Sequence, residues 1–197
     1  MVLDIANIHK MVINLPERTD RLTKFDKEVY PLGWKYEVMH GIRNEVPMIG
    51  IGQAHRKCVM VANNLNIPHV LIMEDDLLLA KSDKLIPYLA TIMADVPDDF
   101  DILLGGYYTG TKIAIHNENW HKVGQFCGLH FYIVAQKFYQ HILNYDGKMH
   151  IDRYMNVNHD HNVYCSNKFF AMQHDGFSDN VGKVTDYLKD ISPKQLL

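Results

Sequence analysis

Short apolar runs alternate with polar, helix-compatible segments along most of this chain. The clearest buried strand covers residues 70–73, and further strands are predicted at residues 11–15, 34–39, 101–104, 129–134 and 168–172. Helical patterns occupy residues 17–33, 50–64, 84–94, 136–143 and 152–157. This alternation of strands and helices predicts an α/β sandwich with a mainly parallel central sheet.

Two segments have a less regular pattern. The tail from Val181 onward is polar and rich in lysine, and we interpret it as a closing helix. Residues 105–110 (GGYYTG) are either a flexible lid whose tyrosines stack on a base or a sugar, or a plain turn between strands. Ligands of such sheets bind beyond the carboxyl ends of the strands, so candidate chemistry is sought there.

Composition narrows the class of protein. The chain has 197 residues, of which 47% are hydrophobic and 22% charged, as in a globular protein with one continuous domain. The formal net charge of −3 indicates no large basic field, which argues against strong nonspecific binding to nucleic acid. Cys58, Cys127 and Cys165 lack any zinc spacing and are interpreted as free thiols.

No apolar run in the sequence has the length of a membrane span, and residues 1–10 lack the core of a signal peptide. We therefore expect a protein of the cytoplasm, either of a bacterium or of a virus-infected host cell.

Three adjacent carboxylates, Glu74, Asp75 and Asp76, directly follow the strand at residues 70–73. Carboxylates packed beside apolar residues are costly unless a cation or a base offsets their charge, and oxygen ligands suit Mn²⁺ or Mg²⁺. In an extended chain Glu74 and Asp76 point to one side, and Asp75 faces elsewhere or caps the next turn. The alternative is that the triplet is a solvated surface feature with a helix cap.

Several segments together resemble glycosyltransferase family 25, which contains lipooligosaccharide and collagen galactosyltransferases. Residues 11–22 (MVINLPERTDRL) resemble its opening (V/I)INLxxRxDR motif, and residues 70–76 (VLIMEDD) resemble its ALILEDD motif. Five shorter segments resemble further motifs of that family and occur in the same order as in the family. Residues 50–55 (GIGQAH) resemble its GCxxSH motif, residues 101–104 (DILL) resemble WDILxLG, and residues 131–134 (FYIV) resemble AYxIS. Residues 150–152 (HID) resemble PVD, and residues 173–179 (QHDGFSD) resemble Q…SD. Ile51 and Ala54 depart from the Cys and Ser of that family.

The resemblance implies a GT-A fold with a nucleotide-sugar donor, for which a UDP-sugar is expected, and Mn²⁺ or Mg²⁺ as cofactor. It divides the chain into a donor-binding part over residues 10–110 and an acceptor-side part over residues 111–197. The residues that it assigns to donor binding are Asn14, Leu15, Arg18, Arg21, His55, Glu74 and Asp75. The surface of a solvated helix is an equal alternative for Arg21, and a structural histidine is an alternative for His55.

Four acidic residues and one histidine are the candidates for metal binding and catalysis. Asp76, Glu74 and His174 are the candidate metal ligands, because carboxylate and imidazole both bind Mn²⁺. Asp152 is the candidate general base, with a helix N-cap as the alternative, and Asp175 is a second catalytic candidate. Asp179 either caps a turn or joins the site, and the group His159, Asp160 and His161 is interpreted as a polar loop.

The predicted function is transfer of a sugar from a nucleotide-sugar to an acceptor hydroxyl. A cation stabilises the charge that develops on the leaving diphosphate. A glycan, a protein side chain and a hydroxymethylated DNA base all remain as acceptors. The competing functions are a metal-dependent phosphohydrolase or nuclease that uses the same carboxylates, and a noncatalytic module that binds a nucleotide-sugar.

Overall fold

The computed structural model describes residues 1–81, 83–157, 160–178, 182–189 and 191–197. Its centre is an eight-stranded sheet with the strand order β2-β1-β3-β8-β5-β9-β7-β6. These strands are β1 (His9–Asn14), β2 (Glu37–His40), β3 (His69–Glu74), β5 (Ile102–Leu104), β6 (Thr109–Ile115), β7 (Trp120–Cys127), β8 (Phe131–Ala135) and β9 (Val163–Ser166).

Most strands of this sheet point the same way. β1 pairs in parallel with both β2 and β3, and β5 pairs in parallel with β9. β8 lies antiparallel between β3 and β5, and β7 lies antiparallel between β9 and β6. β3 and β5 therefore end at the same edge as β1 and β2, which is the arrangement that a ligand site at strand ends requires.

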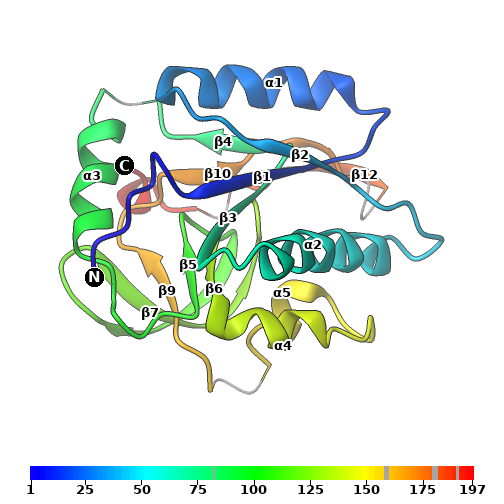
Figure 1. The fold of residues 1–197 in the computed structure, drawn as a ribbon. Coiled ribbons are helices and arrows are strands. Elements are labelled where there is room, and N and C mark those ends of the chain that lie inside the picture. The colour runs from blue at the N-terminus through cyan, green and yellow to red at the C-terminus, as the bar shows by residue number, and fades with distance from the viewer. Residues whose placement is uncertain (82, 158–159, 179–181, 190) are drawn as a thin grey trace.

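Helices cover both faces of the sheet (Figure 1). The helices are α1 (Thr19–Val29), α2 (Pro47–Asn64), α3 (Leu85–Ala94), α4 (Tyr139–Leu143) and α5 (Ile151–Tyr154). Short 3₁₀ turns occur at Tyr30–Leu32, Gln136–Phe138 and Pro193–Gln195. Figure 1 shows α1 over one face of the sheet and α2, α4 and α5 over the other.

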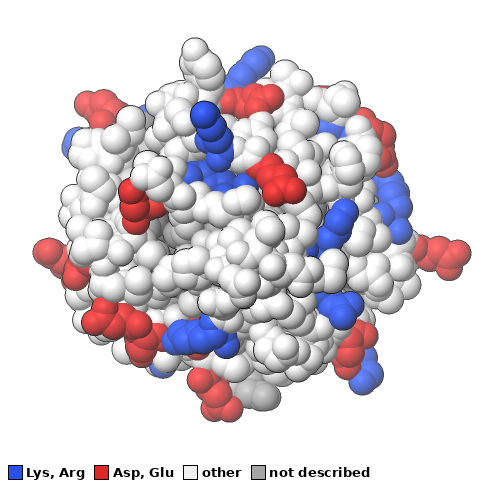
Figure 2. Space-filling view, in the orientation of Figure 1, with Lys and Arg blue, Asp and Glu red and all other residues white. Residues whose placement is uncertain are grey.

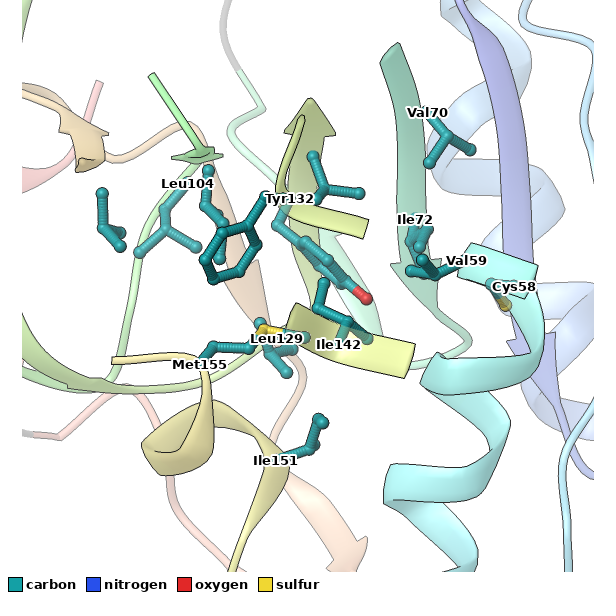
Figure 3. Packing of buried hydrophobic residues seen from close by; sticks show 14 of the residues in the cluster. Cys58, Val59, Val70, Ile72, Leu104, Leu129, Tyr132, Ile142, Ile151 and Met155 are labelled. Atoms are coloured by element: carbon teal, nitrogen blue, oxygen red, sulfur yellow. The ribbon is translucent and has the colours of Figure 1, made fainter. Parts of the chain in front are cut away.

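Each face of the sheet builds its own hydrophobic core, because successive side chains of a strand point to opposite faces. Met11, Ile72 and Tyr132 belong to the core under α2, whereas their chain neighbours Val12 and Ile133 belong to the core under α1 and α3. Figure 3 shows part of the first core, with Val59 of α2 beside Ile72 of β3. The fully buried run that was predicted at residues 70–73 thus reflects packing on both faces.

Two small strand pairs lie outside the central sheet. β4 (Leu77–Leu79) pairs with β10 (Ala171–Gln173), and β11 (Gly176–Ser178) pairs with β12 (Lys183–Thr185). The prediction of a closing helix in the tail is therefore wrong, because the described residues of the tail include a strand and a 3₁₀ turn and no α-helix. The hairpin of β6 and β7 also lies in a stretch for which the sequence predicted no strands, because every residue of β6 is exposed and shows no alternation.

Charged side chains of both signs are interspersed on the face drawn in Figure 2. Among the described residues, no helix is long and apolar enough to cross a membrane. Cys58 and Cys165 are buried, Cys127 is partly exposed, and all three are free thiols.

Candidate active site

A pocket lies along the edge of the sheet where β1, β2 and β3 end. The loop after β2, the first turns of α2, the turn after β3, the loop before β8 and the start of α5 all contribute to it. Its lining includes Leu15, Arg21, Gly41, Ile42, Arg43, Asn44, His55, Glu74, Asp75, Asp76, Tyr108, Gly128, Asp152, Gln173, Ser178 and Tyr187. Seven of these residues are candidates from the sequence: Leu15, Arg21, His55, Glu74, Asp75, Asp76 and Asp152.

The acidic triplet lies at the centre of this edge. Glu74 is the last residue of β3, and the chain turns at Asp75 and Asp76 before it enters β4. Because the chain turns there, the alternation of an extended strand does not apply, and all three side chains line the pocket. The expectation that Asp75 faces elsewhere or caps the next turn is corrected, because Asp75 lies within the turn and its carboxylate contacts Asn14 and Arg21. A helix cap, the alternative for the triplet, is excluded because strand β4 follows the turn.

Asp75 is held by two residues from the beginning of the chain. Its Oδ2 accepts a hydrogen bond from Asn14 Nδ2 at 2.7 Å, and its Oδ1 lies 3.1 Å from an Arg21 guanidinium nitrogen. Asn14 also donates to the carbonyl oxygen of Arg18 at 3.0 Å, which fixes the entry into α1. Asn14 thus supports the acidic edge from behind.

Asp76 is the least satisfied of the three carboxylates. Gln173 Nε2 donates to its Oδ2 at 2.8 Å, and Arg21 lies 3.4 Å from that same oxygen. Oδ1 of Asp76 is buried and accepts no hydrogen bond from the described residues. Burial, together with the charges of Glu74 and Asp75, raises the pKa of Asp76 to about 7. A buried acceptor without a partner is unfavourable, so this carboxylate is suited to a cation.

Glu74 is the end of a buried hydrogen-bonded chain. The Nε2 of His55 lies 3.1 Å from Glu74 Oε1, and the Nδ1 of His55 lies 2.9 Å from the hydroxyl of Tyr132. Burial raises the pKa of Glu74, but the hydrogen bond from His55 and the neighbouring positive charges outweigh it, so the net pKa is lowered. His55 and Tyr132 therefore hold Glu74 as a carboxylate in one orientation.

Asp152 contributes a fourth carboxyl group, from α5. The backbone N–H of Gly128 donates to its Oδ2 at 3.2 Å, and the N–H of Arg153 lies 2.7 Å from its Oδ1. Burial raises the pKa of Asp152 above its ordinary value. The helix N-cap that was the alternative role for this residue is His150 instead.

Four candidates from the sequence lie outside the pocket lining: Asn14, Arg18, His174 and Asp175. Arg18 contacts Asp20 at 3.0 Å, and the ring of His174 lies 3.5 Å from Glu28 in a second cavity behind α1. Asp175 is exposed, and its Oδ1 accepts the backbone N–H of Tyr187 at 2.6 Å. Asp179 and His159 lie outside the described residues.

The sequence did not assign the loop at residues 41–44 to the site. Gly50 allows this loop to pack directly on α2, because a Cβ at position 50 would lie 2.2 Å from the carbonyl oxygen of Ile42. The GIGQAH match is the signal that pointed to this helix, but nothing in the sequence indicated the loop that it supports.

No group of three or more His, Cys, Asp or Glu side chains is arranged to hold a metal within the described part of the chain. Mg²⁺ and similar cations are often bound by one or two carboxylates and completed by phosphates of the substrate. The unpartnered Oδ1 of Asp76 fits a site of this kind, in which the protein supplies few ligands and the substrate supplies the others.

No protein-family model matches the chain, and no curated protein matches it in sequence. Among solved structures, the chain is similar to A197 from STIV, with 13% identity over 90% of this chain and 92% of that one and a TM-score of 0.53. It is also similar to a glycosyltransferase involved in glycosylation of the major capsid of PBCV-1, with 9% identity over 68% and 61% of the two chains and a TM-score of 0.44. A Drosophila β1,4-galactosyltransferase 7 in complex with manganese, UDP-Gal and xylobiose has 13% identity over 80% and 65%, with a TM-score of 0.46.

At these identities the comparisons bear on the fold alone. The protein has a mixed α/β fold around a mostly parallel eight-stranded sheet, similar to that of A197 from STIV, which confirms the predicted α/β fold class.

Proposed function

We propose that this chain is a glycosyltransferase of the family 25 kind that transfers a sugar from a nucleotide-sugar, a UDP-sugar above all, with the help of Mn²⁺ or Mg²⁺. The observation that carries this proposal is the presence of two partly buried carboxyl groups in one pocket. Asp76, with an unpartnered oxygen, lies at the end of β3, and Asp152 enters the same pocket from α5.

The donor nucleotide occupies the part of the pocket formed by β1, β2 and α2. Leu15, Ile42 and Ile51 provide apolar contacts there, and Asn44 provides a polar one. Arg43 also lines this part and adds positive charge for an anionic donor. The division of the chain into a donor part (10–110) and an acceptor part (111–197) belongs to this proposal.

Asp76 would hold the divalent cation, and Glu74 and Asp75 would add negative charge beside it. When bound, the cation supplies positive charge that stabilises the negative charge developing on the leaving nucleotide. His55 and Asn14 keep Glu74 and Asp75 in place through the hydrogen bonds described above. Arg21 contacts both Asp75 and Asp76, and this contact limits the repulsion within the triplet.

Asp152 takes the proton from the acceptor hydroxyl if the transfer inverts the anomeric carbon. Its raised pKa brings it closer to neutral pH, where a general base is most effective. The Gly128 N–H orients one of its oxygens. This role stands on Asp152 lying in the same pocket as the acidic edge.

A screen of nucleotide-sugars tests this proposal. The protein is incubated with UDP-glucose, UDP-galactose, UDP-N-acetylglucosamine and GDP-mannose, each with Mn²⁺ or with EDTA, and release of the nucleoside diphosphate is measured. We expect release from one donor, dependent on Mn²⁺ and lost in Asp76→Asn. Asp98→Asn is the matched control, because Asp98 is an exposed aspartate that contacts the N-terminus.

The same screen separates the competing functions. Release of inorganic phosphate from UDP itself would identify a phosphohydrolase. Binding of a nucleotide-sugar without turnover, with or without an acceptor, would identify a noncatalytic module.

A further inference from the structure

Two tyrosine rings from distant parts of the chain meet at the wall of the pocket. Tyr108 follows β5, and Tyr187 belongs to the tail after β12. Their ring centroids are 5.3 Å apart, the ring planes are inclined by 54°, and both residues are half-buried and line the pocket. The proposed function gives these rings no role.

Tyr108 is supported by the same glycine that orients Asp152. A Cβ at Gly128 would lie 3.1 Å from the Tyr108 ring, so the ring packs against the backbone there. Gly128 has a φ of +116°, a conformation that favours glycine. Its N–H donates to Asp152, so the ring and the carboxylate both lie against the backbone at Gly128.

Tyr187 is held by the turn that Asp175 closes. Asp175 Oδ1 accepts the backbone N–H groups of Tyr187 at 2.6 Å and of Leu188 at 3.2 Å. An Arg21 nitrogen donates to the carbonyl oxygen of Phe177, which ties the same part of the chain to the acidic edge. Asp175 therefore fixes the position of a pocket residue without lining the pocket itself.

The strand order shows which end of the pocket the rings occupy. In the order β2-β1-β3-β8-β5, the acidic triplet follows β3 in the middle. The proposed nucleotide part lies over β1 and β2, and Tyr108 follows β5 on the other side. Neighbouring strands are about 4.8 Å apart, so β5 lies roughly 14 Å from β1. The rings are thus on the Asp152 side, where an acceptor must approach.

We propose that Tyr108 and Tyr187 form an acceptor subsite for a sugar ring, and that the acceptor is therefore a carbohydrate; this inference rests on the proposed function. The apolar C–H face of a pyranose packs against an aromatic ring, and its hydroxyl groups then reach the carboxylate beside it. The inclination of 54° leaves no parallel slot for a flat nucleobase between the rings.

The charges near the rings favour the same ligand. The loop before β8 and the start of α5 contribute Gly128, Leu129, His150, Ile151 and Asp152 to the lining, and none of these is Lys or Arg. Arg153, which interacts electrostatically with Tyr108, is exposed and lies outside the lining. A nucleic-acid acceptor needs cationic contacts to its phosphates. A neutral saccharide has no such need.

The test measures saccharide binding and nucleotide binding separately. Methyl glycosides of glucose, galactose, mannose and xylose are examined by saturation-transfer NMR, both without nucleotide and with UDP and Mg²⁺, and UDP affinity is measured by calorimetry. The variants are Tyr187→Ala, Tyr187→Phe, which keeps the ring, and Tyr30→Ala as a control, because Tyr30 is 84% exposed and outside the pocket lining.

We expect at least one glycoside to receive saturation in the wild type, and the signal to fall about fivefold or more in Tyr187→Ala. Tyr187→Phe and Tyr30→Ala keep the signal, and UDP affinity changes less than about twofold in all variants. No glycoside signal in the wild type, an unchanged signal in Tyr187→Ala, or a parallel loss of UDP affinity would each overturn the acceptor subsite. Failure of UDP to bind the wild type would count against the proposed function. The NMR measurement without nucleotide would still test whether the two tyrosine rings bind a saccharide.

Discussion

Two groups of aspartates lie at opposite edges of the same sheet, and they differ in how their charges are satisfied. Asp75 and Asp76 follow β3. Asp99 and Asp101 precede β5, so they lie where that strand begins. In sequence the two groups look alike, since each has acidic residues next to a short apolar strand.

The carboxylates of the group before β5 are bound by a lysine and by hydrogen-bond donors. Asp101 contacts Lys137 Nζ at 3.0 Å and accepts the N–H of Asn162 at 2.8 Å, and Asp99 accepts the hydroxyl of Tyr164 at 2.9 Å. These bonds connect the start of β5 to the segments before β9 and after β8. The carboxylates at this edge have a structural role.

The group after β3 has more negative charge than its partners offset. Arg21 is shared between Asp75 and Asp76, Oδ1 of Asp76 is buried without a partner among the described residues, and the pKa of Asp76 is raised to about 7. The side chains of Asp76 and Asp101 are equally exposed, at 14% each, so the two edges differ in how their charges are offset and not in burial. The proposed role of the edge after β3 rests on that difference.

The largest expected difference between the two edges is in catalysis. Under the proposed function, Asp76→Asn should lower kcat by about 100-fold or more, because Asp76 is the proposed ligand of the cation and the substitution removes its charge. Asp101→Asn should leave kcat within about twofold, since Asp101 lies outside the pocket lining. Steady-state kinetics with the donor found in the screen checks both, and equal losses in the two variants would remove the distinction.

Asp152 should behave like Asp76, because it is also partly buried and its pKa is also raised. Asp152→Asn should lower kcat by about 100-fold, with UDP affinity unchanged, because a general base acts on the acceptor proton and not on the nucleotide. Kinetics combined with calorimetry of UDP separates these effects. A kcat close to that of the wild type would exclude Asp152 as the base.

For the free energy of unfolding the order should be reversed, with the larger loss on substitution of Asp101 and the smaller one on substitution of Asp76. Asp101→Ala leaves the N–H of Asn162 without its acceptor and should lower the free energy of unfolding by about 1–3 kcal/mol. Asp76→Asn keeps an acceptor for Gln173 and removes a repulsive charge, so it should not destabilise the metal-free protein. Urea unfolding in EDTA measures both changes, and a larger loss in Asp76→Asn than in Asp101→Ala would contradict the comparison.

The smallest effect is the pH dependence of stability. The folded chain holds the Asp76 proton more tightly than the unfolded chain does, because the pKa rises from 3.8 to about 7 on folding. Stability from this group therefore falls as the pH rises from about 4 to about 7 and is constant above that. Relative to Asp76→Asn, the metal-free wild type should lose on the order of 1–3 kcal/mol over this range. Unfolding at several pH values in EDTA measures this, and parallel curves would show that Asp76 does not titrate there.

The sequence predicted the elements whose burial leaves a simple pattern. The run at residues 70–73 became β3, and the helix at residues 50–64 became α2, which begins three residues earlier at Pro47. It also predicted the acidic edge, His55 and Asp152, which line one pocket. These residues lie on regular elements or directly after them.

What the sequence could not predict depends on contacts between distant segments. Tyr187 reaches the pocket only because Asp175 closes a turn in the tail, and the ring of His174 lies beside Glu28 because β10 pairs with β4. The exposed strand β6 is formed by its pairing with β7. None of these features has a local periodicity from which it could be predicted.

The most direct test of the account is calorimetric titration of UDP in Mn²⁺ and in EDTA. Our proposal is that the edge after β3 binds a cation and that the donor nucleotide supplies the remaining ligands of that cation. It predicts that Mn²⁺ strengthens UDP binding about tenfold or more, that Asp76→Asn abolishes this coupling, and that Asp101→Asn preserves it. UDP binding that is equal in Mn²⁺ and EDTA, or coupling that survives in Asp76→Asn, would contradict the claim.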